Sequence, residues 1–198
     1  MYWYGYDNSS RIRELLDFIS SMIVLSFAFS YNYIIHGRSE LVPAVIIAIT
    51  SSFALHEFAH RYVARANGAY AKYRAWYMGL LIALVLTIAT QGRFTFAAPG
   101  AVTVYTPWYS HEIEASIALA GPLINIAIGF ICLISSLFTQ GIVHQYLRII
   151  GGINSFIALF NLLPMPPLDG YKVFRANIIK WLVSFVFSIL LWIAYLLS

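Results

Sequence analysis

Residues 41–64 read LVPAVIIAITSSFALHEFAHRYVA, a long apolar stretch that ends with the ionisable side chains of His56, Glu57 and His60. A bilayer core about 30 Å thick is crossed by about 20 apolar residues of helix, so this stretch is long enough to span a membrane. Ionisable groups inside a membrane are costly and usually functional. The stretch therefore predicts a membrane helix that carries a functional site close to one of its ends.

The composition of the whole chain supports a membrane protein. The chain has 198 residues, of which 61% are hydrophobic and only 10% are charged, whereas soluble domains are about 45–50% apolar and about 25% charged. The net charge is +4, and the basic residues are scattered among apolar segments rather than clustered. This pattern is not that of a nucleic-acid-binding surface, so the predicted surroundings are a lipid bilayer and no nucleic acid is expected.

Further apolar segments predict an all-α polytopic membrane protein with five to six transmembrane helices. Besides 41–64, the candidates are residues 15–35, 113–138, 147–163 and 177–197. A sixth segment, 76–90, is apolar but short, and it either spans the membrane or enters and returns. The length suits one domain, which we place at residues 1–198 with its core at about 41–175.

The basic residues favour re-entry of the segment 76–90. If this segment returns to its own side, nine basic residues share that side, and only Arg38 and Arg148 lie opposite, with Arg93 undecided. These nine are Arg11, Arg13, Arg61, Arg65, Lys72, Arg74, Lys172, Arg175 and Lys180. If the segment crosses, the last three change sides and most of the bias disappears. Basic loops favour the cytoplasm, so a cytoplasmic N-terminus and a re-entrant segment are predicted.

The stretch FTFAAPGAVTVY, residues 94–105, follows directly and predicts a β-hairpin. Aromatic and β-branched residues flank a Pro99-Gly100 turn signal. An open sheet edge facing lipid would be costly, so the hairpin has to lie beside protein or a water-filled cavity.

The spacing of His56 and His60 predicts a metal site. Residues four apart share one face of a helix, so two imidazoles can bind one Zn²⁺ while Glu57 acts as a general base. A purely structural cluster of these side chains is the alternative. A catalytic zinc usually has three protein ligands and an open position, which requires a third ligand elsewhere in the chain.

Asp169 is the best candidate for that ligand. It follows NLLPMPPL, whose prolines end the preceding helix and leave an extended stretch. With two crossings between His60 and Asp169, both lie at the same side of the membrane. The other three histidines stand at segment ends or in loops.

Two asparagines, Asn125 and Asn161, lie within apolar helices. A buried amide in a membrane has to find hydrogen-bond partners. Interhelical contact and a catalytic part are about equally plausible for either residue from the sequence.

The ordered combination of HEFAH, AAPGAV, AGPLIN and NLLPMPPLDG, over residues 50–175, resembles the site-2 protease family of intramembrane zinc metalloproteases. The resemblance implies one Zn²⁺ per chain held by His56, His60 and Asp169, with Glu57 as general acid and base. It implies that Asn125 and Asn161 position substrate or stabilise the oxyanion, and that the β element near 94–105 pairs with substrate.

The function expected from this resemblance is hydrolysis of peptide bonds within or near transmembrane segments. The expected partner is a transmembrane protein or peptide, and the expected location is the plasma membrane of a prokaryote, as a multi-pass protein. Two alternatives are a metal transporter, which needs ionisable residues along a path through the membrane, and an inactive adaptor, which would be expected to have lost Glu57 or a ligand.

Overall fold

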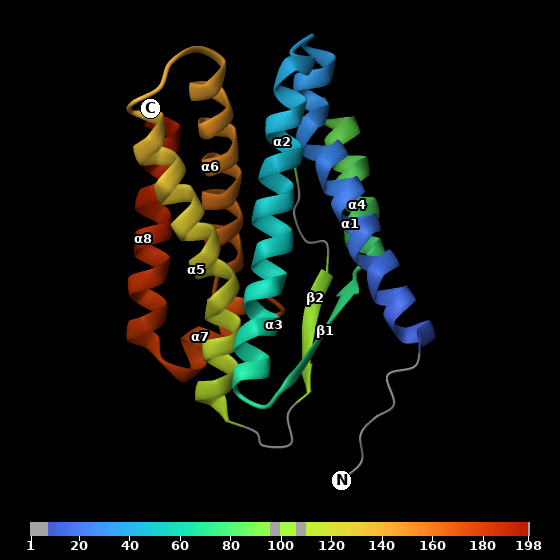
Figure 1. The fold of residues 1–198 in the computed structure, drawn as a ribbon, viewed down its shortest axis with the longest axis vertical. Helices are drawn as coiled ribbons and strands as arrows, with labels where there is room; N and C mark the ends of the chain where they lie inside the picture. Colours follow the sequence, from blue (N-terminus) through green and yellow to red (C-terminus); the bar gives the residue numbers. More distant parts are fainter. Residues whose placement is uncertain (1–7, 96–99, 106–109, 198) are drawn as a thin grey trace.

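The computed structural model describes residues 8–95, 100–105 and 110–197, which form a bundle of long helices with a small sheet near one end (Figure 1). One long helical stretch is continuous from Ser39 to Ala66 and is made of four consecutive pieces. In chain order, the elements are α1 (Asn8–Ile35), a 3₁₀ turn (Ser39–Leu41), α2 (Val42–Ile49), a π-helical turn (Thr50–Leu55), α3 (His56–Ala66), β1 (Tyr70–Ala75), α4 (Tyr77–Ala89), β2 (Gly100–Tyr105), α5 (His111–Ser136), α6 (Gly141–Asn161), α7 (Asp169–Ala176) and α8 (Ile178–Leu197).

Four helical stretches of the described residues are long and apolar enough to cross a membrane. They are Arg11–Ile35, Ser39–Ala66, His111–Ser136 and Ile178–Leu197, and they coincide with four of the predicted spans. The predicted span 147–163 falls on α6, a full-length helix that is not among the four. The predicted segment 76–90 falls on α4, which is apolar and has 13 residues. The fold is therefore that of an all-α integral membrane protein.

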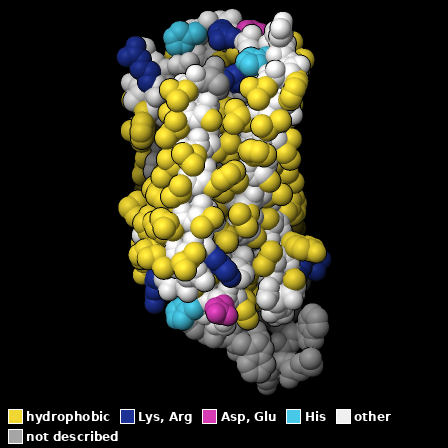
Figure 2. All heavy atoms as spheres, turned by 90° about the vertical axis from the view of Figure 1, so that its left-hand side faces the viewer, with side chains coloured by type: hydrophobic (Ala, Val, Ile, Leu, Met, Phe, Trp, Pro, Cys, Tyr) yellow, Lys and Arg dark blue, Asp and Glu magenta, His cyan; other side chains and the backbone are white. Residues whose placement is uncertain are grey.

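The outer surface of the bundle suits lipid. In Figure 2, hydrophobic side chains cover the length of the molecule on the side of α8, and charged side chains gather toward the two ends. On α8, the side chains of Val183 and Leu190 are 65% and 60% exposed. Apolar side chains with this exposure would be unfavourable in water and are suited to contact with the acyl chains of lipids.

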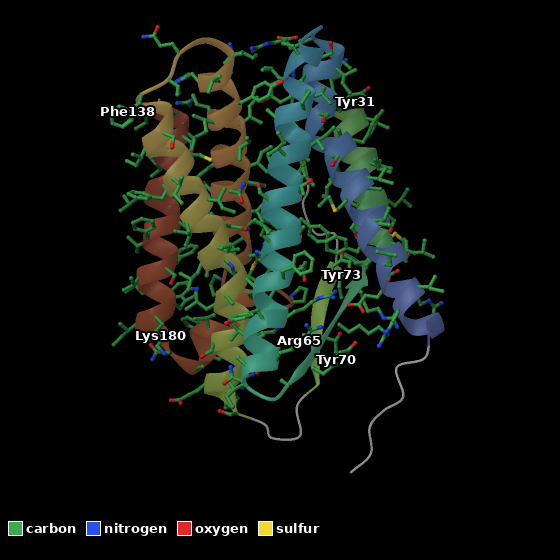
Figure 3. All side chains as sticks on the ribbon, in the orientation of Figure 1. Tyr31, Arg65, Tyr70, Tyr73, Phe138 and Lys180 are labelled. Carbon is green, nitrogen blue, oxygen red and sulfur yellow. The ribbon has the colours of Figure 1, made fainter. Side chains whose placement is uncertain are left out.

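The chain leaves the sheet end through α4 and comes back to that end at β2 (Figure 1). At the far end of this excursion, Asn32 near the end of α1 donates a hydrogen bond to the carbonyl of Gln91, at 3.3 Å. Arg93 lines a cavity there together with Arg148. Figure 3 shows Phe138 at this end and Arg65 and Lys180 at the sheet end. The elements that carry the nine grouped basic residues, which are the start of α1, α3, β1, α7 and the start of α8, lie toward the sheet end (Figure 1), and Arg93 lies with Arg38 and Arg148 toward the opposite end.

The pairing of the strands differs from the predicted hairpin. β2 is antiparallel to β1, with Tyr70 opposite Tyr105 and Ala75 opposite Gly100. Phe94 is not in a strand, and residues 96–99 lie outside the described residues. β1 is the partner because its alternate residues, Ala71 and Tyr73, are buried against the helices, which fixes the register of a strand.

Two buried acidic residues of α1 hold this sheet. The Glu14 carboxylate accepts hydrogen bonds from the Arg61 guanidinium of α3, at 2.5 Å, and from the backbone N–H of Tyr73, at 2.9 Å. One turn along α1, the Asp17 carboxylate accepts hydrogen bonds from the Arg74 guanidinium of β1, at 3.4 Å, and from the Tyr77 hydroxyl at the start of α4, at 2.6 Å. Because α3 carries the HEFAH segment, these contacts place α1, the sheet and that segment in one fixed arrangement.

The π-helical turn before α3 also binds buried amides. Asn154 of α6 donates to the Ser51 hydroxyl, at 2.9 Å, and Asn125 of α5 donates to the Ser52 carbonyl, at 3.1 Å. A π-helical turn holds an extra residue and often marks a functional site. Here it ends directly before His56.

Candidate metal centre

Three possible metal ligands converge at the sheet end of the bundle. The Nε2 atoms of His56 and His60 lie 3.2 Å and 3.1 Å from the same carboxylate oxygen, Oδ2 of Asp169. One donor atom from each residue lies within 4.8 Å of the other two. The predicted meeting of two imidazoles from one helix with a distant carboxylate is thus found in the structure.

The segment after α6 brings Asp169 to this point. α6 ends at Asn161, the proline-rich stretch turns the chain, and Asp169 is the first residue of α7. A Cβ atom at Gly170 would overlap the carbonyl of Leu162, so only glycine permits this close backbone approach. Burial alone would raise the pKa of Asp169, but the neighbouring imidazoles of His60 and His56 hold that pKa below its ordinary value.

One face of α5 supports both histidines through Ile117, Gly121 and Asn125, which are spaced four residues apart. The His60 Nδ1 atom lies 2.7 Å from the carbonyl of Ile117, which accepts its proton and leaves Nε2 free for a metal. A Cβ atom at Gly121 would lie 2.5 Å from His56 Nε2 and 2.6 Å from His60 Nε2. No sequence pattern indicates the part of the Ile117 carbonyl, whereas the four-residue spacing of Gly121 and Asn125 in AGPLIN could have indicated a common face.

Glu57 lies beside the three possible ligands, and one oxygen of its carboxylate is buried without a partner among the described residues. The residue is 6% exposed, and Oε2 has no hydrogen-bond partner among the described residues. A buried carboxylate oxygen without a partner is unfavourable. It is therefore available to a proton donor, such as water or a substrate amide, that enters the site.

A cavity of about 660 Å³ adjoins these side chains and offers room for a substrate segment. Glu57 and the three possible ligands line it together with Asn161, whose side-chain amide donates to the Ile157 carbonyl at 3.0 Å. Other walls come from α1, the π-helical turn, both strands, the residue after β1, α6, the segment before α7 and α7 itself: Leu25, Ser52, Phe53, Arg74, Ala75, Trp76, Gly100, Thr103, Ile157, Phe160, Met165, Pro166, Pro167, Leu168 and Lys172.

Asn125 lies behind His56 and does not line this cavity. Its side chain is fully buried, and its Nδ2 atom lies 3.1 Å from His56 Nδ1 as well as 3.1 Å from the Ser52 carbonyl. The two predicted asparagines are thus both near the centre, but only Asn161 faces the space open to substrate.

The donor set fits a catalytic zinc ion. Two imidazoles and one carboxylate are ligands that zinc accepts, and three protein ligands leave a position for water. The α5 residue Gly121 leaves room beside both Nε2 atoms, and the orphan oxygen of Glu57 borders the same space. These features are those expected around a metal with a general base at its side.

Comparison with known proteins gives relatives of the same chemistry. The chain is 41% identical over 174 residues to MJ0611 of Methanocaldococcus jannaschii, named as a candidate zinc metalloprotease, and the match covers 86% of this chain and 88% of that protein. It is 30% identical over 153 residues to YwhC of Bacillus subtilis, named likewise, with 68% of each chain covered. The zinc metalloprotease MJ0392 of M. jannaschii is 28% identical over 74% of this chain, but the match covers 38% of that longer protein. No solved structure matches this chain at a significant level.

The family model of peptidase family M50 matches residues 44–145, which include HEFAH and AGPLIN and are more than half of the chain. The full-length similarity to MJ0611 extends this match. The chain therefore belongs to peptidase family M50, the site-2 protease family, and is a zinc metalloprotease.

Proposed function

We propose that this protein hydrolyses peptide bonds within or near transmembrane segments of membrane-protein substrates, with His56, His60 and Asp169 as zinc ligands and Glu57 as general acid and base. The observation that carries the proposal is the convergence of the three donor atoms, within 4.8 Å, beside a cavity at one end of a membrane-length helix. The unpartnered Oε2 of Glu57 in the same cavity supplies the base.

The residues divide the chemistry between them. Zinc, when bound, supplies Lewis acidity toward water and toward the peptide carbonyl. Glu57 takes a proton from the attacking water at Oε2 and later delivers it to the leaving amine. Asn161, on the cavity wall, binds the substrate carbonyl or the developing oxyanion.

The cavity suits an extended substrate. A peptide in a membrane helix hides its backbone in its own hydrogen bonds, so the substrate has to unwind before cleavage. Gly100 and Thr103 of β2 line the cavity, and β2 is the outer strand of a sheet in which only β1 pairs with it among the described residues. Pairing of the substrate with this outer strand would replace the hydrogen bonds lost on unwinding.

We also propose the arrangement in the membrane. α1, the stretch 39–66, α5, α6 and α8 cross it, whereas α4 and the chain that returns to β2 form a re-entrant element. The nine basic residues at the sheet end favour a cytoplasmic N-terminus, in the plasma membrane of a prokaryote. Residues 1–198 act as one intramembrane protease domain.

Three variants test the chemistry. Purified protein in lipid vesicles is assayed for zinc content and for cleavage of a fluorogenic peptide with a transmembrane segment. Asp169→Ala is expected to lose zinc and cleavage, and Glu57→Gln to keep zinc but lose cleavage by about 10²–10⁴-fold. His36→Ala is the control, because His36 is exposed and its side-chain hydrogen bond among the described residues goes to the Asn32 carbonyl, at 2.8 Å.

Full cleavage by a zinc-loaded Glu57→Gln variant would contradict the assigned chemistry, and full zinc content in Asp169→Ala would contradict the ligand set. Zinc flux into sealed vesicles without peptide cleavage would instead favour a metal transporter. Zinc binding with neither flux nor cleavage would favour an inactive adaptor.

A further inference from the structure

We propose that Asn125 is a positioning residue that holds the His56 ring so that its Nε2 atom faces the metal. This inference rests on the proposed ligand set, and it gives Asn125 a part other than contact with substrate. It means that one side chain of α5 determines which nitrogen of the His56 ring carries the proton.

Burial and contacts separate Asn125 from the substrate. The side chain is fully buried, and it does not line the metal cavity. Both of its described contacts, the Ser52 carbonyl and His56 Nδ1, lie 3.1 Å from Nδ2. A group with this placement can act on the reaction through His56 rather than by touching the peptide.

A histidine that gives Nε2 to a metal carries its proton on Nδ1 and donates it to an acceptor. The Asn125 carboxamide holds such an acceptor, because Oδ1 is buried and has no hydrogen-bond partner among the described residues. A half-turn of the carboxamide exchanges its two ends and places Oδ1 at the Nδ2 position, against His56 Nδ1. This exchange gives up the Nδ2 hydrogen bond to the Ser52 carbonyl, which zinc binding at Nε2 has to offset. In this orientation, Asn125 accepts the Nδ1 proton and keeps Nε2 free.

The second histidine shows the same arrangement with a different acceptor. His60 Nδ1 lies 2.7 Å from the carbonyl of Ile117, which is eight residues before Asn125 and therefore on the same side of α5. One face of α5 thus contacts both imidazole rings. The backbone carbonyl of Ile117 contacts His60, and the side chain of Asn125 contacts His56. Only the His56 support can be removed by substitution.

Asn154 of α6 offers a matched control. It is also a fully buried amide, and its Oδ1 likewise has no hydrogen-bond partner among the described residues. Its Nδ2 donates to the Ser51 hydroxyl at 2.9 Å and to the Ile150 carbonyl at 2.8 Å, so its described hydrogen bonds reach the π-helical turn but no histidine. A loss caused merely by removing a buried amide would appear equally at Asn154.

The experiment measures metal binding by the full chain in detergent. Zinc dissociation constants come from competition with a chromophoric chelator, and the ligand geometry comes from the visible absorption of the cobalt-substituted protein. Asn125→Leu is expected to weaken zinc binding about 10–100-fold and to change the cobalt spectrum. Asn125→Asp is expected to bind zinc at least as tightly as wild type, because its carboxylate accepts the Nδ1 proton. Asn154→Leu is expected to match wild type in both zinc affinity and the cobalt spectrum.

Wild-type affinity and spectrum in Asn125→Leu would overturn the inference, and so would an equal loss in Asn154→Leu or in Asn125→Asp. Thermal unfolding identifies a variant that does not fold, and Asn125→Ala then replaces Asn125→Leu in the same comparison. Failure of the underlying ligand set is seen separately, as unchanged zinc affinity in Asp169→Ala.

Discussion

Gly121 stands where the metal centre has no room for a side chain, and this gives the sharpest single-residue prediction. Gly121→Ala would place a methyl group 2.5–2.6 Å from the Nε2 atoms of both histidines, so the rings have to turn away. We expect zinc affinity to fall by about tenfold or more, as for other disturbed metal shells, and cleavage to fall with it. Zinc competition and peptide cleavage measure the two effects.

Gly152→Ala is the control for this substitution. Gly152 also lies within a helix, and the nearest atom to an added Cβ would be Tyr195 Cδ1, at an ordinary 3.7 Å. Both substitutions gain helix propensity, about 1 kcal/mol. If the two variants kept equal zinc affinity, the close contact at Gly121 would have no influence on the metal.

At this scale, the sequence predicted the three residues that converge in the structure better than the groups that surround them. The four-residue spacing in HEFAH places both imidazoles on one face, and the proline-rich stretch leads to Asp169, so these positions followed from local geometry. The direction in which Asn125 points depends on how α5 rotates against α3, which no local pattern reports. The Ile117 carbonyl is a backbone group, so the identity of the residue does not indicate that it accepts a hydrogen bond.

At the scale of elements, Glu14 joins α1 to β1 and α3. Glu14→Gln removes the negative charge that lies 2.5 Å from the Arg61 guanidinium, and the Glu14 side chain is only 9% exposed. We expect a loss of about 1–3 kcal/mol in the free energy of unfolding, as for hydrogen bonds between charged groups. A change of 1 kcal/mol corresponds to about 2–4 °C in a chain of this size, so thermal unfolding in detergent will detect it.

The matched substitution is Glu40→Gln at the opposite end of the bundle. Glu40 pairs with Arg38 at 3.7 Å, and the two side chains are 55% and 50% exposed. An exposed pair of this kind contributes at most about 1 kcal/mol. Equal destabilisation by the two substitutions would mean that Glu14 is no more than another surface charge.

The proposed zinc ligands join α3 to α7, so zinc should stabilise the fold. A ligand present at about 100 times its dissociation constant adds about 2.7 kcal/mol to the free energy of unfolding. We expect a chelator to lower the melting temperature of the wild-type protein and to leave that of His60→Ala almost unchanged. The same shift in both proteins would show that the chelator acts elsewhere.

The elements themselves were predicted unevenly. Long apolar helices were located because their length and composition are local properties. The strand at Gly100–Tyr105 was also indicated, but its partner was not, because strand pairing depends on which segment is already held by other elements. Here Glu14 and the burial of Tyr73 hold β1 in place.

At the scale of the whole molecule, the charge distribution predicts the orientation in the membrane. Asn67 lies at the sheet end and Gln140 at the opposite end, and both are exposed. In a variant without Cys132, Asn67→Cys should react with a membrane-impermeant maleimide only after cells are permeabilised. Gln140→Cys should react in intact cells. The reverse labelling pattern would invert the proposed topology.

The overall architecture followed from the sequence because a membrane imposes one length scale on every crossing helix. Composition and the four clear apolar stretches identified an all-α membrane protein. Whether α6 and the α4 excursion cross a bilayer is not decided by length alone. α6 carries Arg148, which donates to the Tyr195 carbonyl at 2.6 Å, and α4 is short.

The π-helical turn at Thr50–Leu55 has a consequence for comparing related chains. Each residue of an α-helix advances the direction of its side chain by about 100°, and a π-helical turn contains one additional residue. A homologue with one residue fewer between Val42 and Leu55 could replace the π-helical turn by regular α-helix and still aim both histidines at the aspartate, because the π-helical turn absorbs its additional residue without rotating the helix that follows. Aligning HEFAH with related chains thus calls for allowing a one-residue gap upstream of the motif, since such a gap does not by itself mean that the metal site is lost.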